Sequence, residues 1–322
     1  MNSTVWNIVL LAAGFVLLIK GADYLVMGAS SLARRFKVSE LVIGLTVVAF
    51  GTSTPELIVN LVSAYKGLND VAFGNIIGSN VFNLLFILGL SAAIRPVNVQ
   101  RSTIFKEIPY SIIAAIVLLL LANDHLYTDS RNNAVGTIDA LILLFFFSLF
   151  LFYVFKNMKS DNPDLNVERN EYSLLATLLF IAGGLAALVF GGKLSVDNAV
   201  EIAHRLGISE RIIGLTIIAV GTSLPELATS AVAAYRKNSD IAIGNVVGSN
   251  IFNIFLVLGA TALVRPLPYQ LKFNYDATFL IASTFLLLMF TYTGRKSVLQ
   301  RWQGAALLLC YIGYTVWLIL AE

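Results

Sequence analysis

The sequence has few charged residues and almost no cysteine or histidine. Of its 322 residues only 13% are charged, whereas 57% are apolar and the mean hydropathy is +0.80. A soluble domain of this length carries about a quarter charged residues, so most of this surface is expected to face lipid. The single cysteine, Cys310, excludes an intrachain disulfide and a cysteine-based metal site, and the two histidines lie in predicted loops.

The chain also lacks a dense basic patch and a basic start. Its formal net charge is only +3, so nucleic acid is not an expected partner. A cleaved signal peptide normally opens on positive charge, whereas this chain opens MNSTVWNIVLL. The first apolar run is therefore predicted to be a retained helix in a lipid bilayer.

Apolar segments of roughly twenty residues, the length that crosses a bilayer, recur along the whole chain. They predict an all-α polytopic membrane protein with ten transmembrane helices. These lie near residues 5–30, 38–65, 70–94, 106–122, 138–155, 173–203, 208–235, 240–264, 276–292 and 302–320. The most polar stretch, residues 156–172, is expected to be a cytoplasmic linker between a first half, 1–155, and a second half, 173–322.

The two halves are copies of each other. A shift of 170 residues places residues 21–96 on 191–266 without a gap, and 35 of these 76 positions are identical. The motif cores of the two copies are residues 38–96 and 208–266. Five crossings per half is an odd number, so the second copy must enter the membrane from the opposite side.

The charges of the loops agree with such an inverted repeat. If both termini are outside the cell, the predicted inside loops hold fourteen lysines and arginines and the outside loops hold six. This excess is the one that the positive-inside rule expects. The sequence therefore predicts two inverted-topology repeats of five helices each, with both termini outside the cell.

Two glutamates, Glu56 and Glu226, stand at matched positions in the middle of apolar segments. A charged side chain at the centre of a membrane helix costs about 3 kcal/mol even on lenient insertion scales. A function is therefore expected for each of them. Pro55 and Pro225 adjoin the glutamates, and each proline frees a backbone carbonyl one helical turn earlier.

Other oxygen-bearing groups lie within helical reach of each glutamate or on the next helix. Carboxylate, hydroxyl, amide and carbonyl oxygens are ligands for hard cations such as Na⁺ and Ca²⁺. Ser79 and Ser249, on the predicted helix that follows each glutamate, could instead bond within their own helices. Asn75 and Asn245 could cap helix breaks instead of binding ions. The predicted cation ligands are Glu56, Glu226, Thr52, Ser53, Thr222, Ser223, Ser79, Ser249, Asn83, Asn253, Ala49 and Ala219.

The motifs GTSTPE and GTSLPE, each followed by GNxxGSNxFN, resemble the paired alpha-repeats of the calcium/cation antiporter superfamily, and in particular its prokaryotic sodium/calcium exchanger branch. The resemblance implies that helices 2, 3, 7 and 8 form a central diamond with four cation sites, while helices 1 and 6 slide across it. It also implies that Glu56 and Glu226 bind Ca²⁺ in exchange for Na⁺, and that the chain lies in the plasma (inner) membrane of a prokaryote. Many members carry Asp where this chain has Asn253, so the centre here holds two carboxylates instead of three.

The resulting prediction is a secondary antiporter, not an enzyme, which exchanges Na⁺ for Ca²⁺ by alternating access without a cofactor or an obligatory protein partner. A Ca²⁺/H⁺ antiporter that uses the same glutamates as proton carriers is an alternative. A passive cation channel is disfavoured by the inverted repeat. An intramembrane metal hydrolase is opposed because the chain has no HExxH motif and no histidine near either glutamate.

Overall fold

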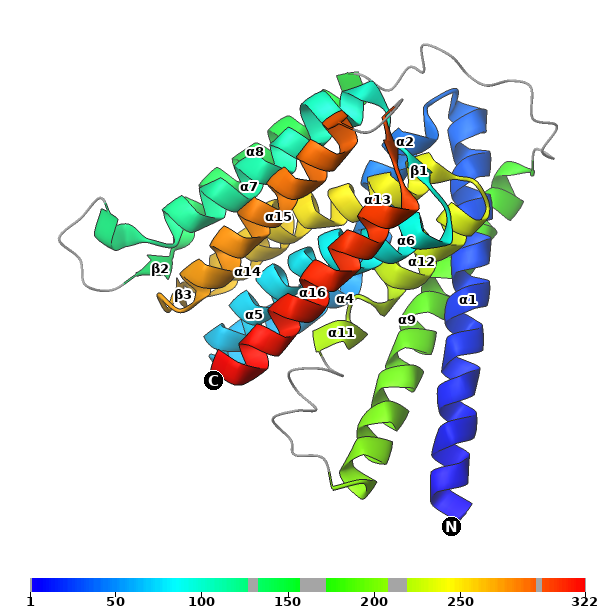
Figure 1. The fold of residues 1–322 in the computed structure, drawn as a ribbon, viewed down its shortest axis with the longest axis horizontal. Helices are drawn as coiled ribbons and strands as arrows, with labels where there is room; N and C mark the ends of the chain where they lie inside the picture. The colour runs from blue at the N-terminus through cyan, green and yellow to red at the C-terminus, as the bar shows by residue number, and fades with distance from the viewer. Residues whose placement is uncertain (1, 127–132, 157–171, 208–218, 294–296, 322) are drawn as a thin grey trace.

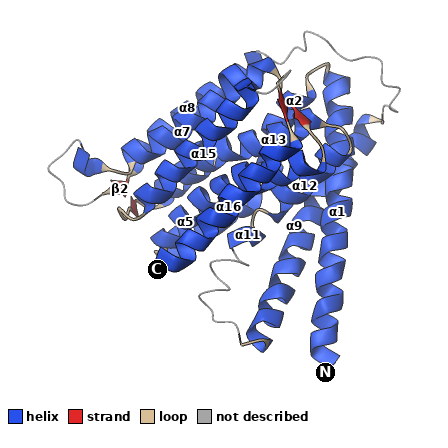
Figure 2. Cartoon of the chain, in the orientation of Figure 1, coloured by secondary structure: helices blue, strands red, loops and turns tan. Residues whose placement is uncertain are grey.

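The structure of the chain, a computed structural model, is almost entirely helical (Figures 1 and 2). It describes residues 2–126, 133–156, 172–207, 219–293 and 297–321. Within these ranges, eight helices are long and apolar enough to cross a membrane, and a bent pair, Glu40–Thr52 with Thr54–Lys66, makes a ninth. The predicted all-α polytopic membrane fold is therefore confirmed.

Two predicted segments fall partly outside the described residues. The beginning of the seventh predicted helix, residues 208–218, is one of them, and most of the predicted linker, residues 157–171, is the other. The division into two five-helix halves joined by a cytoplasmic linker therefore stays a prediction.

The helices and strands follow the same order in the two copies of the repeat. In the first copy they are α1 Asn2–Phe36, α2 Glu40–Ile43, η1 Gly44–Val48, α3 Ala49–Thr52, α4 Thr54–Lys66, α5 Asn69–Val81, η2 Phe82–Ile87, α6 Leu88–Ile94, β1 Val97–Asn98, η3 Thr103–Glu107, α7 Ile108–Leu121, η4 Asp124–Leu126, β2 Ala134–Val135 and α8 Thr137–Lys156. In the second copy they are α9 Leu174–Arg205, α11 Ala219–Gly221, α12 Leu224–Tyr235, α13 Ser239–Ile251, η6 Phe252–Leu258, α14 Gly259–Val264, β3 Leu267–Pro268, α15 Phe273–Thr293, β4 Val298–Leu299 and α16 Arg301–Ala321.

Three of the described spans change from α-helix to π-helix and back: the bent pair, at η1, and two matched spans of the two copies. The span Asn69–Ile94 consists of α5, η2 and α6, and its counterpart Ser239–Val264 consists of α13, η6 and α14. The π-helical segments η2 and η6 begin one residue before Asn83 and one residue before Asn253. A π-helical turn interrupts the regular α-helical hydrogen bonds and is frequent at functional sites. In the sequence, Asn75, Ser79 and Asn83 recur every four residues. This regular spacing gave no sign of the interruption.

The two longest helices, α1 and α9, run antiparallel side by side (Figure 1). Gly14 lies against Gly191 and Gly21 lies against Gly184, so the same two positions of the repeat are exchanged between the copies. A Cβ atom at Gly14 would lie 2.9 Å from the Gly191 carbonyl oxygen, and one at Gly21 would lie 2.8 Å from the Gly184 carbonyl oxygen. Glycine at these positions lets the two backbones approach closely.

Two short antiparallel strand pairs also join the copies. Strand β1 pairs with β4, with Val97 opposite Leu299, and β2 pairs with β3, with Val135 opposite Leu267. Each pair links a connecting segment of one copy to a connecting segment of the other. The pairing satisfies backbone groups that a helix end would otherwise leave open.

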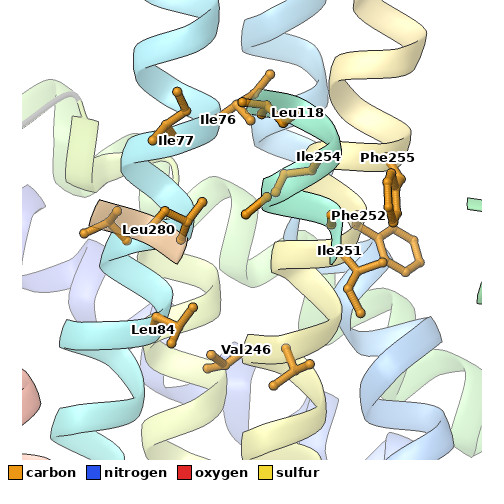
Figure 3. Packing of buried hydrophobic residues seen from close by; sticks show 14 of the residues in the cluster. Ile76, Ile77, Leu84, Leu118, Val246, Ile251, Phe252, Ile254, Phe255 and Leu280 are labelled. Atoms are coloured by element: carbon orange, nitrogen blue, oxygen red, sulfur yellow. The ribbon is translucent and has the colours of Figure 1, made fainter. Parts of the chain in front are cut away.

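The buried centre of the molecule is formed by the two matched spans that contain η2 and η6. In their most apolar windows, 78% of the Asn69–Ile94 span and 94% of the Ser239–Val264 span is buried, against 22% for the first helix. Figure 3 shows part of this core, where Ile76 and Ile254 contribute side chains from different copies of the repeat. Long helices such as α1 therefore face lipid, whereas α5 and α13 are surrounded by protein.

Candidate cation-binding site

Each predicted site glutamate lies in the first turn of a helix that follows a break. Glu56 is in the first turn of α4, which begins after the break at Ser53, and Glu226 is in the first turn of α12, which begins after Ser223. The axes of the helices before and after Ser53 differ by 43°. The adjoining prolines also lie in these first turns, where a missing N–H group leaves no hydrogen bond unmade. A helix N-terminus favours a negative charge, so the breaks place both glutamates where a carboxylate is stabilised.

The two glutamates are buried, and each is held by a serine of the other copy. Only 1% of Glu56 and 0% of Glu226 is exposed. Ser223 Oγ donates a hydrogen bond of 2.9 Å to Glu56 Oε1, and Ser53 Oγ donates one of 3.0 Å to Glu226 Oε1. Ser53 precedes the helix of Glu56 but bonds to Glu226, and Ser223 precedes the helix of Glu226 but bonds to Glu56. These crosswise bonds bring the two carboxylates into one site between the copies.

Two threonine–asparagine pairs extend this crosswise pattern. Thr52 Oγ1 donates to Asn245 Oδ1 at 3.0 Å, and Thr222 Oγ1 donates to Asn75 Oδ1 at 3.1 Å. In addition, Asn245 Nδ2 donates to the Glu226 backbone carbonyl at 3.3 Å. The Glu226 carbonyl lies inside α12, so this bond does not cap the break at Ser223, and Asn75 and Asn245 each accept a hydrogen bond from a threonine of the predicted site.

The two serines of the next helices point toward the glutamates. Ser79 Oγ lies 3.0 Å from Ser223 Oγ, and Ser249 Oγ donates a long hydrogen bond of 3.5 Å to Glu226 Oε1. The first contact joins α5 to the break that precedes α12, and the second joins α13 to the first turn of α12. The two serines therefore belong to the same network as the carboxylates, in place of the contact within their own helices that the sequence left open.

The predicted amides Asn83 and Asn253 are buried at the start of the π-helical segments. Asn83 Nδ2 donates to Asn250 Oδ1 and Asn253 Nδ2 donates to Asn80 Oδ1, both at 3.1 Å. The sequence interpretation missed Asn80 and Asn250 as part of this region. The signal that could have found them is the triplet GSN, which is identical in the two copies.

The two predicted alanines supply the least information. The Ala49 carbonyl oxygen accepts a hydrogen bond from the Ser53 N–H at 3.0 Å and a weaker one from Thr52 Oγ1 at 3.4 Å. Ala219 is the first described residue of α11. Their predicted role as carbonyl donors to a cation therefore stays a prediction.

Four side-chain oxygen atoms of the predicted cation ligands have no hydrogen-bond partner within the described part of the chain. They are Glu56 Oε2, Glu226 Oε2, Asn83 Oδ1 and Asn253 Oδ1, two matched pairs from the two copies. A buried polar atom without a partner is unfavourable, and a bound cation would give these carboxylate and amide oxygens the partner that they lack. The unpartnered atoms therefore fit a site for hard cations.

The charge of the site is set by the two glutamates. In the described residues, none of the ion pairs involves Glu56 or Glu226. No cluster of three or more acidic, histidine or cysteine side chains with metal-site geometry occurs there either. The oxygen donors around the glutamates are neutral hydroxyls and amides, so the site carries at most two negative charges.

Comparison with known proteins agrees with this arrangement. A family profile described as sodium/calcium exchanger protein matches residues 6–156 and 176–320. The chain belongs to the sodium/calcium exchanger family. It is 32% identical over 343 residues to the sodium/calcium exchanger MaX1 of Methanosarcina acetivorans, with 96% of this chain and 97% of MaX1 covered. It is 36% identical over 321 residues to the inner membrane protein YrbG of Escherichia coli, with 96% and 94% covered.

A solved structure of a member of this family has the same fold. The sodium-calcium exchanger NCX_Mj, in a crystal soaked with 10 mM Na⁺ and zero Ca²⁺, superposes with a TM-score of 0.83 at 34% sequence identity, over 96% of this chain and 97% of that one. As a member of the sodium/calcium exchanger family, the chain is a cation antiporter of the membrane. The predicted family and fold are thereby confirmed.

Proposed function

We propose that this antiporter exchanges Na⁺ for Ca²⁺ by alternating access, with the two ions competing for Glu56 and Glu226. The observation that carries the proposal is the pair of buried glutamates, each of which accepts a hydrogen bond from a serine of the other copy, Ser53 or Ser223. Each glutamate also has one carboxylate oxygen without a hydrogen-bond partner within the described residues. Two carboxylates neutralise one Ca²⁺. The same oxygens suit Na⁺, so the two ions occupy the site in turn.

The burial of the charges explains why transport would be an exchange. An empty site would leave two buried carboxylates without a counter-ion, which is strongly unfavourable. Only a loaded site passes through a state closed to both sides, so each ion that leaves must be replaced by another. A leak of either ion down its own gradient is thereby suppressed.

The remaining ligands are those that surround the two carboxylates. In this proposal the hydroxyl, amide and carbonyl oxygens complete the coordination of the ions as they shed water. They come from Thr52, Ser53, Thr222, Ser223, Ser79, Ser249, Asn83, Asn253, Ala49 and Ala219.

The two ends of the site differ in exposure, which supports access from one side at a time. At one end Thr52 is 1% exposed and Asn245 is 0% exposed. At the matched end Thr222 is half-buried and Asn75 is 9% exposed. Alternating access would exchange the two environments between the copies.

The proposal includes an orientation in the membrane. The antiparallel α1 and α9 support two copies inserted in opposite directions, because equivalent helices then cross the bilayer in opposite senses. The loop charges place both termini outside the plasma membrane of a prokaryotic cell. Cysteine accessibility at the two ends of the chain tests this orientation.

The experiment that tests the function is uptake of radioactive Ca²⁺ into proteoliposomes preloaded with Na⁺. We expect uptake that requires the outward Na⁺ gradient, is lost in Glu226→Gln, and is retained in Glu201→Gln. Glu201 is a control because it is exposed and pairs with Arg205 on its own helix at 2.8 Å, away from the two buried glutamates. Equal uptake by wild type and Glu226→Gln would refute the role of the glutamates.

Asn253 favours one second candidate, a Ca²⁺/H⁺ antiporter that uses the same site. Because two carboxylates cannot balance three Na⁺, a site without a third carboxylate is also suited to exchange of Ca²⁺ for two protons. The same proteoliposomes decide, since Ca²⁺ uptake without Na⁺ would then follow an outward proton gradient. Uptake that ignores this gradient and follows Na⁺ rejects the second candidate.

A further inference from the structure

Four asparagines form a closed set of hydrogen bonds where the two copies meet beside the candidate site. Asn80 and Asn250 lie in the last turn of α5 and α13, and Asn83 and Asn253 lie at the start of η2 and η6. None of the four is more than 1% exposed. Water is therefore not a competing partner, and the amides must satisfy one another or a bound ion.

The first pair of bonds fixes Asn80 and Asn250 on each other's backbone. Asn80 Nδ2 donates to the Asn250 carbonyl oxygen at 3.3 Å, and Asn250 Nδ2 donates to the Asn80 carbonyl oxygen at 3.2 Å. Because each Nδ2 group is held in this way, the Oδ1 atom of the same amide points to the other side. Both amide orientations are thus determined by backbone atoms, which cannot rotate away.

The second pair of bonds passes this orientation on to the site. Asn253 Nδ2 donates to Asn80 Oδ1 and Asn83 Nδ2 donates to Asn250 Oδ1. The remaining atoms, Asn83 Oδ1 and Asn253 Oδ1, have no hydrogen-bond partner within the described residues. Each site amide therefore presents its oxygen, and not its N–H₂ group, to a ligand.

The orientation matters because an amide has two ends of nearly equal shape and opposite polarity. The oxygen end attracts a cation, whereas the N–H₂ end repels it. An amide held only by its shape would sample both orientations. A donor bond on the far side of Nδ2 removes the unfavourable orientation before an ion arrives.

We propose that Asn80 and Asn250 are positioning residues that lock the amides of Asn253 and Asn83 with their oxygens toward the transported cation. The inference rests on the proposed function, since it assumes that this cation occupies the site of Glu56 and Glu226. Each lock acts across the interface: Asn80 of the first copy orients Asn253 of the second, and Asn250 orients Asn83. Neither Asn80 nor Asn250 contacts the ion.

An aspartate provides the means to separate a lock from a packing role. A carboxylate has two oxygens and no wrong end, so Asn253→Asp makes the orientation set by Asn80 irrelevant. Asn80→Ala is therefore expected to weaken ion binding in the wild-type background and to have no such effect in the Asn253→Asp background. Asn83→Asp is the matched control, because Asn80 does not orient Asn83.

The experiment is calorimetric titration of the purified full-length protein with Ca²⁺ and, separately, with Na⁺. Loss of one hydrogen bond of ordinary strength changes an equilibrium constant by roughly twofold to tenfold. We expect Asn80→Ala to raise the dissociation constants by such a factor in wild type and in Asn83→Asp, and not to raise them in Asn253→Asp, where Asn80 Oδ1 faces a carboxylate oxygen that it cannot bond. If Asn80→Ala does not fold, Asn250→Ala with Asn83→Asp is the mirror-image test, and Asn253→Asp becomes its control.

The outcomes distinguish this inference from the proposed function. The same fold-change in all three backgrounds would mean that Asn80 only supports packing, and it would overturn the lock while cation binding stands. A wild-type protein that binds neither ion would overturn the lock and the proposed function together. Binding that depends on Asn80 only where residue 253 is an amide is the result that the lock requires.

Discussion

Gly248→Ala should loosen the contact between α13 and the segment that carries the ligands of the first copy. A Cβ atom at Gly248 would lie 2.8 Å from the Ala49 Cβ atom and 3.0 Å from the backbone of Leu45. Neither neighbour is the end of a flexible side chain, so α13 must move away from η1 and α3. The movement would also lengthen the bond between Thr52 and Asn245, which crosses the same interface at 3.0 Å.

The expected magnitude follows from two opposing effects. Forcing one extra methyl group into a tight contact costs about 1–3 kcal/mol. Replacing glycine by alanine inside a helix gains about 1 kcal/mol of helix stability. At Gly248 the clash should outweigh the gain, and the free energy of unfolding should fall by up to about 2 kcal/mol.

The control is Gly183→Ala, at an exposed glycine inside α9. Among the described residues, nothing lies within 4 Å of a Cβ atom built on Gly183. This variant should therefore keep or slightly raise the unfolding temperature, whereas Gly248→Ala lowers it, when both are measured by thermal unfolding in the same detergent. Equal destabilisation of the two variants would refute the reasoning, because it would mean that both glycines are packed alike.

Three further substitutions test other contacts. Tyr153→Phe removes the hydroxyl that donates to the buried Glu107, and thermal unfolding should show a loss of about 1–3 kcal/mol because a buried carboxyl oxygen loses its partner. Ser223→Ala removes the bond to Glu56 Oε1, so the Ca²⁺ dissociation constant from calorimetry should rise about tenfold; an unchanged constant would exclude this serine from the site. Asp23→Asn breaks a half-exposed ion pair between α1 and the end of α12, and unfolding should change by less than about 1 kcal/mol.

The sequence indicated most residues of the candidate site because both copies of the repeat carry the same motif. Glu56 and Glu226 stand out as charges in apolar segments, and the shift of 170 residues assigns each neighbouring hydroxyl or amide a partner position. In the structure Ser53, Ser223 and Ser249 donate to one or the other carboxylate and Ser79 contacts Ser223, whereas the amides of Asn83 and Asn253 donate to Asn250 and Asn80. The role of these residues as cation ligands stays a prediction. The carbonyls of Ala49 and Ala219, the placement of the two halves and the outside location of the termini remain predictions.

The crosswise character of the network was not predictable from spacing within a helix. Helical periodicity places Ser53 near Glu56, whereas in the structure Ser53 donates to Glu226 instead. It also treats Asn80 as one more polar residue on α5, although its partners lie 170 and 173 positions away. The periodicity of a sequence describes the faces of one helix, and it gives no information about the helix on the other side of an interface.

Composition and repetition by themselves determined that the chain is a helical membrane protein, that it is duplicated, and that two glutamates lie at its centre. These properties follow from the cost of charge in lipid and from counting along one chain. The tertiary structure decided which oxygens are left without a partner, which end of each amide is held by a hydrogen bond, and where the helices change to π-helix. Hydrogen bonds depend on distances of a few tenths of an ångström and on angles between segments far apart in the chain, and only the packed arrangement of the two copies sets them.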